Sequence, residues 1–279
     1  MENPGLSLRV ARARDLLAIA ILTAASACAE RAPTASAGFV GRTDVPPPLV
    51  DVLKREIGGE SRWIGLQGDE DGVLLGLNPF RVLAQQTDPA ARIWARREVV
   101  IAVRADHPAA AAIGSEGFRA FTRPELRDRV AFPDPATSGV GLAVLAQIVR
   151  EYGWGYPAAA YRNGALAIDE GALPVLLRSG DRAVGIGTRG AFEGLAGISI
   201  VIPGDLRLTV PALMSVHGEG LEAAMVLVER AVGTSAARRA APRLEVLKPG
   251  DDRSPPEWLL DAHQRRAAIL DRFRRVTGR

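Results

Sequence analysis

Residues 127–153, near the middle of the chain, constrain the fold more than any other segment. Val130 to Phe132 form a short apolar strand, and Pro133 and Pro135 end it by restricting the backbone and removing N–H donors. Thr137 or Ser138 then stands at an N-cap position, before an apolar stripe at helical spacing and a closing Gly153; the stripe consists of Leu142, Leu145, Ile148 and Val149. The segment predicts a βα unit, in which a helix covers a sheet.

The first turn of this predicted helix carries two glycines, Gly139 and Gly141. Without side chains over the turn, the free N–H groups of the helix start could face a bound anion, which the positive end of the helix dipole favours. The alternative is an ordinary βα unit whose helix is only capped.

Strands and helices alternate along most of the chain. A strand ending at Val40 and a helix over 49–57 come first, whereas residues 63–76 allow no single assignment. Further strands are expected at 98–104, near 166, and at 182–186, 198–202 and 209–216, with helices at 140–152, 171–179, 220–232 and 256–276. This order predicts an α/β fold with a parallel or mixed sheet, whose ligands lie beyond the carboxyl ends of the strands.

The first 28 residues have the features of an export signal. A basic region with Arg9, Arg12 and Arg14 precedes an apolar run over 16–27 that is too short to span a bilayer. The small residues before Cys28 resemble the lipobox of bacterial lipoproteins, in which that cysteine is acylated, although Ala25 replaces the preferred leucine. A plain signal peptide cut near Ala27 is the alternative. Both place the protein outside the cytoplasm, and residues 29–38 are expected to form a tether.

Composition excludes several classes of protein. Cys28 is the only cysteine, so no intramolecular disulfide is available and stability must come from a core. The net charge of +3 is small and the arginines are interleaved with acids, which argues against a nucleic-acid-binding protein.

No catalytic or cofactor motif is apparent. The three histidines, His107, His217 and His263, are too scattered for a metal site. Ser138 does not lie in a Gly-x-Ser-x-Gly elbow, and Gly185-Ile186-Gly187 lacks the third glycine of a dinucleotide fingerprint. We therefore expect neither an enzyme nor a bound cofactor.

Several short motifs occur in an order known from one family. They lie at 121–139, at Arg162-Asn163-Gly164, at 176–188 and at Val201-Ile202-Pro203. With the export signal, this order resembles the type 2 periplasmic solute-binding proteins of ABC transporters, in particular the group related to ferric-iron binders. The resemblance covers about residues 95–240, and each motif is weak when taken alone.

The resemblance implies two α/β lobes that close around a solute by a hinge. Strand 99–104 and the segment 203–210 would cross between the lobes. Lobe 2 is then expected at 106–207, and lobe 1 at 38–105 plus 208–279, with the first lobe shortened relative to the family.

Ferric binders of this group present two adjacent tyrosines to the metal, but the equivalent segment here is 187–192, Gly-Thr-Arg-Gly-Ala-Phe. Arg189 instead favours an anion. We therefore expect a monomeric binder of a small anionic or chelated solute, which is held by the membrane through its lipid anchor and delivers the solute to an ABC permease. The expected ligand-binding residues are Thr43, Asp44, Thr137, Ser138, Gly139, Asn163, Thr188 and Arg189.

Two other functions remain open. A chain with a shortened lobe could have lost ligand capture and serve as an interaction or sensory module at the membrane. A hydrolase that uses Ser138 as its nucleophile is the third possibility.

Overall fold

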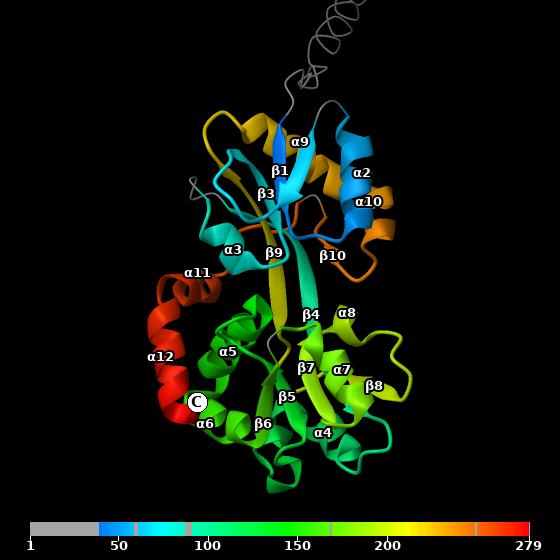
Figure 1. Ribbon diagram of the computed structural model, residues 1–279, viewed down its shortest axis with the longest axis vertical. Coiled ribbons are helices and arrows are strands. Elements are labelled where there is room, and N and C mark those ends of the chain that lie inside the picture. Colours follow the sequence, from blue (N-terminus) through cyan, green and yellow to red (C-terminus); the bar gives the residue numbers. More distant parts are fainter. Residues whose placement is uncertain (1–38, 59–60, 87–90, 168, 249, 279) are drawn as a thin grey trace, which may run out of the picture. The chain divides into compact units, whose positions relative to one another are not determined.

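The computed structural model describes residues 39–58, 61–86, 91–167, 169–248 and 250–278, so the expected export signal, Cys28 and tether lie outside the described residues. Strand β4 (Arg92–Arg104) organises the fold because it belongs to two groups of strands. Its first half, up to Glu98, pairs with β9, and its second half, from Val99, pairs with β7. We call the elements around the first half lobe 1 and those around the second half lobe 2 (Figure 1).

Lobe 1 contains parallel and antiparallel strands. Its strands are β1 (Val40–Thr43), β2 (Arg62–Gly65), β3 (Gly72–Gly76), β9 (Thr209–His217) and β10 (Glu245–Val246). The order β2-β1-β3-β9-β4 combines parallel β2-β1-β3 with antiparallel β9. Its helices are α2 (Pro47–Ile57), α3 (Pro79–Leu83), α9 (Glu222–Val232) and α10 (Ser235–Ala240). Strands β2 and β3 occupy the stretch that the sequence analysis left unassigned.

Lobe 2 continues the sheet in the order β4-β7-β5-β6, with β8 also pairing to β4. Its strands are β5 (Val130–Pro133), β6 (Gly164–Ala167), β7 (Val184–Thr188) and β8 (Ile198–Val201). Its helices are α4 (Ala110–Glu116), α5 (Gly139–Tyr152), α6 (Gly155–Ala160), α7 (Ala172–Ser179) and α8 (Arg189–Phe192), with short 3-10 helices at Gly117–Thr122, Pro124–Leu126 and Tyr161–Asn163. The predicted alternation of strands and helices is confirmed.

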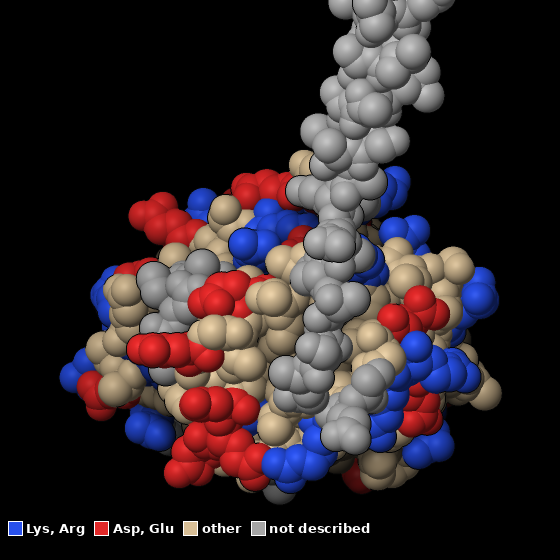
Figure 2. Space-filling view, turned by 90° about the horizontal axis from the view of Figure 1, so that it is seen from above, with Lys and Arg blue, Asp and Glu red and all other residues tan. Residues whose placement is uncertain are grey.

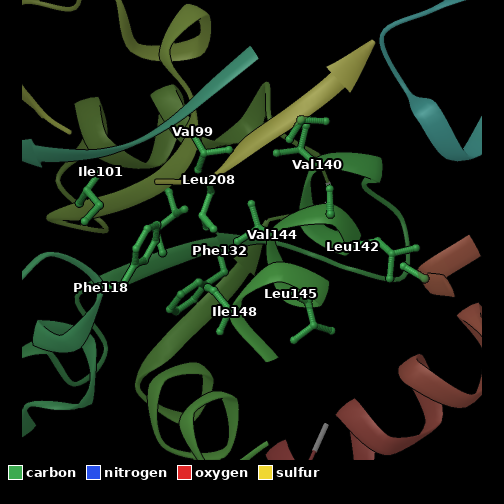
Figure 3. Close-up of a cluster of buried hydrophobic side chains, with 14 of the residues drawn as sticks. Val99, Ile101, Phe118, Phe132, Val140, Leu142, Val144, Leu145, Ile148 and Leu208 are labelled. Atoms are coloured by element: carbon green, nitrogen blue, oxygen red, sulfur yellow. The ribbon is translucent and has the colours of Figure 1, made fainter. Parts of the chain in front are cut away.

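Helix α5 carries much of the core. The side chains of Val140, Val144 and Ile148 lie with Phe132 of β5 and Leu208 in one apolar cluster (Figure 3). This cluster also contains Leu74 and Phe80 of lobe 1. The two lobes therefore share a continuous core on the side of α3 and α5. The opposite face of the lobe 1 sheet packs separately against α2 and α9.

The C-terminal region differs from the sequence expectation in two ways. Instead of one helix over 256–276, it forms α11 (Glu257–Gln264) and α12 (Arg266–Thr277), because Arg265 leaves the helical conformation at φ −99° and ψ 15°. These helices pack on α5 and α6 of lobe 2, although the sequence analysis assigned 208–279 to lobe 1. Phe273 lies edge-to-face on Tyr161, with ring centroids 5.0 Å apart, and this contact attaches α12 to lobe 2.

The surface mixes charges of both signs. Viewed from the end of the molecule that carries β1 and α2, acidic and basic side chains lie beside one another (Figure 2). Among the residues placed by the structure, no helix is both long and apolar enough to cross a membrane.

Candidate functional site

The loops that follow β1, β3, β5 and β7 meet where lobe 1 and lobe 2 adjoin. Thr43 and Thr188 are the last residues of β1 and β7, and Ser138 precedes α5. Asn78, after β3, lies directly against Gly139 of α5. The junction thus gathers most of the expected site residues.

Thr43 and Asp44 use their side chains to hold the lobe 1 loops together. Thr43 Oγ1 donates to the carbonyl of Leu75 at 2.6 Å and accepts from the N–H of Val45 at 3.1 Å. The Asp44 carboxylate accepts from the N–H groups of Leu77 at 2.5 Å and Asn78 at 3.2 Å. Asp44 therefore fixes the loop that carries Asn78.

The start of α5 is capped by Ser138 and lies against Asn78 of lobe 1. Ser138 is its N-cap and is 8% exposed, with Oγ accepting from the N–H of Gly141 at 3.2 Å. A Cβ on Gly139 would lie 2.3 Å from Asn78 Oδ1, so the Asn78 side chain lies directly against this glycine. A Cβ on Gly141 would lie 2.4 Å from the carbonyl of Pro133, so this glycine allows the helix to approach its strand. The turn thus has the cap of an ordinary βα unit, and an anion at this turn stays a prediction.

Two other expected residues are Asn163, which lies far from this turn, and Thr137, which precedes it. Asn163 is in the 3-10 helix before β6, and Gly164 of that strand pairs with Val130, the first residue of β5. Asn163 therefore lies at the edge of the sheet where β5 begins, whereas Ser138 follows the end of β5. The expectation that Asn163 and Ser138 share one edge is wrong. Thr137 lies between β5 and α5, where its N–H donates to the carbonyl of Asp134 at 3.3 Å.

Arg97 and Glu170 form a charged link at the junction that the sequence analysis missed. Arg97, on β4, lies 3.5 Å from the Glu170 carboxylate and donates to the carbonyl of Leu77 at 2.7 Å. Glu170 also accepts from the N–H of Thr188. Lobe 2 is thus linked to the β3–α3 loop of lobe 1 through a residue on the strand they share.

Burial changes the pKa of the arginine in this link. The side chains of Arg97 and Glu170 are 11% and 18% exposed. Desolvation lowers the pKa of Arg97, while the negative charges of Glu170 and Asp44 oppose the shift. Arg97 Nε is buried without a hydrogen-bond partner in the described part of the chain. The sequence signal for this site is the charged triplet Arg96-Arg97-Glu98, which interrupts an otherwise apolar strand.

Arg189, at the start of α8, pairs with Glu98 of β4. Its Nε and Nη2 atoms both lie 2.8 Å from Glu98 Oε2. Both side chains are about one-third exposed, at 37% and 35%. They lie at the edge of a cavity of about 420 Å³.

We call this cavity the arginine groove. Its floor includes Glu98 and Val99 of β4 and Thr209 of β9, and its walls are α8 of lobe 2 and the segment 242–245 of lobe 1. The arginines that line it are Arg96, Arg189, Arg207 and Arg243. The acids are Glu98, Glu193 and Glu245. The groove is therefore a hollow between the lobes whose lining is rich in charged side chains.

Three further hollows contain none of the expected site residues. One of about 570 Å³ lies between α5 and α11, and one of about 640 Å³ lies around His107 at the far end of lobe 2. A third, of about 550 Å³, lies against α9 and α10. Of these four hollows, only the arginine groove contains one of the predicted residues, Arg189.

The three tyrosines all make ring contacts within lobe 2. Tyr152 and Tyr156 stack on each other in lobe 2 with ring centroids 4.9 Å apart, and Tyr161 stacks on Phe132 at 4.1 Å. Burial raises the pKa of all three phenols. Within the described ranges, no group of three or more His, Cys, Asp or Glu side chains is arranged to hold a metal ion.

Solved structures with the same fold are periplasmic binding proteins. Apo ferric ion-binding protein A of Pasteurella haemolytica is 16% identical over 86% of this chain and 97% of that chain, with a TM-score of 0.67. AfuA of Actinobacillus pleuropneumoniae, with exogenous fructose 6-phosphate bound, is 13% identical over 87% of this chain and 99% of that chain, with a TM-score of 0.66. Iron-bound HitA of Pseudomonas aeruginosa is 13% identical over 86% of this chain and 99% of that chain, with a TM-score of 0.64. They confirm the predicted type 2 periplasmic-binding-protein fold.

Family membership comes from the sequence itself. No curated protein matches the chain significantly. Residues 80–241, more than half of the chain, match the model of a family described as bacterial extracellular solute-binding proteins. The chain therefore belongs to the bacterial extracellular solute-binding proteins.

Proposed function

We propose that this protein captures a small anionic or chelated-metal solute between its lobes and delivers it to an ABC permease. The observation that carries the proposal is the arginine groove, a cavity of about 420 Å³ whose walls come from both lobes and whose floor is the pair of strands β4 and β9. A solute held there touches both lobes at once, so binding couples to their relative position.

The groove has the chemistry expected for an anion. Guanidinium groups donate paired hydrogen bonds to carboxylate and phosphoryl oxygens. Its volume falls within the range of small-molecule sites, roughly 300–1,000 Å³. Two structural relatives hold small solutes: AfuA has fructose 6-phosphate, an anion, bound, and HitA has iron bound. These observations favour an anionic solute or an anion-chelated metal.

The proposal includes export and attachment to the membrane. The basic and apolar regions before Cys28, and the small residues beside it, support a lipoprotein signal. A lipid at Cys28 would hold the binding protein close to its permease. Mass spectrometry of the protein from its own host distinguishes an acylated Cys28 from a chain cut by an ordinary signal peptidase.

Solute binding is tested with a panel of anions. We expect one of phosphate, a phosphonate, sulfate, molybdate, citrate or a ferric chelate to raise the melting temperature, because a ligand that binds only the folded state stabilises it. At a concentration one hundred times the Kd, the stabilisation is about 2.7 kcal/mol. A panel in which no compound changes the melting temperature contradicts the proposal.

A second candidate function is an interaction module at the membrane. The observation that favours it is the closed contact between Asn78 and Gly139, which lies at the turn where the sequence analysis expected a solute. Such a protein stays ligand-free and co-purifies with a partner protein. Crosslinking in the host, followed by mass spectrometry, separates this function from solute delivery, whose crosslinks lead to a permease.

The proposal is binding rather than catalysis. Ser138 is buried and its hydroxyl caps α5, which does not suit a nucleophile. We expect Ser138→Ala to show the same behaviour as the unaltered protein toward ester and phosphoester substrates. Hydrolysis that disappears in this variant would instead support an enzyme.

A further inference from the structure

We propose that the anion-recognition site is the arginine groove, where Arg96 and Arg207 bind one phosphoryl or carboxylate group of the solute. This inference rests on the proposed function and specifies its site. It differs from the sequence expectation, which placed the anion at the start of α5, where Asn78 now lies.

The ion pairs in the groove distinguish two kinds of arginine. Arg189 is paired with Glu98 at 2.8 Å. Arg243 is paired with Glu193 at 3.4 Å and donates to the carbonyl of Gly190 at 2.7 Å. These two arginines are already neutralised and held in place.

Neither Arg96 nor Arg207 forms a hydrogen bond or an ion pair with another described residue. The carboxylate of Asp252, which does not line the groove, interacts with Arg96 only through its charge. Both guanidinium groups therefore keep their donors for a solute. Among the residues that line the groove, these two arginines and Glu245 remain once the two ion pairs have cancelled, so the lining carries one surplus positive charge. That balance matches a solute with a single anionic group.

The backbone register shows how β4 separates the groove from the charged link at the lobe junction. Side chains alternate along a strand, so Arg96 and Glu98 share one face, and Arg97 lies on the other face with Glu170. Arg96 pairs in register with Glu245 of β10, and Glu98 with Thr209 of β9. The groove therefore lies across three neighbouring strands.

This arrangement gives Glu245 a specific effect. A carboxylate opposite Arg96 competes with the solute for that guanidinium and repels an incoming anion. Because Glu245 is exposed, both effects are moderate and weaken in salt. Removing its charge should strengthen anion binding, whereas removing Arg96 or Arg207 should weaken it.

The test is isothermal titration of the purified full chain with inorganic phosphate, fructose 6-phosphate, citrate and, as the neutral probe, fructose. We expect binding by at least one anion and none by fructose. Arg96→Gln and Arg207→Gln should each raise its Kd roughly tenfold or more, as the loss of a charged hydrogen bond implies. Glu245→Gln should lower the Kd for the same anion.

Arg92→Gln is the matched control. Arg92 lies on the same strand but pairs with Glu229 at 3.1 Å and does not line the groove. We expect the Arg92→Gln variant to bind the anion with the same Kd as the unaltered protein. Circular dichroism melting curves show whether each variant is folded.

The results distinguish the site from the function. If the protein binds an anion, and Arg96→Gln and Arg207→Gln bind it as well as Arg92→Gln does, the groove is not the site while the proposed function stands. If the unaltered protein binds none of the three anions, the inference is overturned. In that case, binding of a ferric chelate or another compound of the wider panel keeps the proposed function, and no binding at all overturns both.

Discussion

Replacing Glu170 by glutamine should destabilise the protein strongly, because it removes one charge of the largely buried link at the lobe junction. The nearest nitrogen and oxygen of Arg97 and Glu170 are 3.5 Å apart, and the side chains are only 11% and 18% exposed. At this separation the Coulomb attraction is about 5 kcal/mol for an effective dielectric constant of about 20. Desolvation of the ions offsets part of it, and breaking one partner of a buried pair typically costs about 3–5 kcal/mol.

We expect a loss near the lower limit, about 3 kcal/mol, because both side chains keep some contact with water and the substituted amide oxygen still accepts from the N–H of Thr188. The free energy of unfolding is measured by urea denaturation. For a chain of this size the melting temperature should fall by roughly 6–12 °C.

Glu193→Gln is the control for this prediction. Glu193 also pairs with an arginine, Arg243, but these side chains are 51% and 53% exposed. The substitution should change the free energy of unfolding by at most about 0.5 kcal/mol, as for other surface pairs. Equal stabilities of Glu170→Gln and Glu193→Gln would show that the link at the junction does not stabilise the fold.

Three further predictions concern the junction and His107. Gly139→Ala should cost about 1–3 kcal/mol, because its Cβ would lie 2.3 Å from Asn78 Oδ1. Its cost should shrink in a background of Asn78→Ala, and strict additivity in urea denaturation would contradict the contact. Ser138→Ala should cost about 1 kcal/mol through loss of the α5 N-cap, while the Kd for the solute stays unchanged. A large rise in that Kd would place the solute at α5 after all. Burial lowers the pKa of His107, and the positive charge of Arg129 adds to the shift. The folded protein thus favours the neutral imidazole, so this contribution to stability is present above about pH 6.5 and is lost as the pH falls below it. An NMR titration should give His107 a midpoint below about 6.5, and a higher midpoint would refute this.

Local signals in the sequence predicted the elements well. Prolines 133 and 135, the apolar spacing from Leu142 and the closing Gly153 lead to the observed β5 and α5, with Ser138 as N-cap. Each of these signals acts within a few residues, so it can be recognised without knowing the rest of the fold. The same reasoning failed at Arg265, where no proline or glycine announces the break between α11 and α12.

The site was harder to predict because it depends on packing between distant segments. Nothing near Gly139 in the sequence indicates that Asn78, which comes 61 residues earlier, lies directly against this glycine. The Arg97–Glu170 link likewise joins residues 73 positions apart. Arg189 was identified, but its pairing with Glu98 and its place in the arginine groove follow from strand register.

Native mass spectrometry of the protein purified from its own host tests most directly whether it captures an anionic solute. We expect the folded chain to carry an additional mass that corresponds to one small compound with a phosphoryl or carboxylate group, or to its metal chelate. That mass should be absent from a variant that combines Arg96→Gln with Arg207→Gln. A chain without bound solute in both proteins would contradict the account.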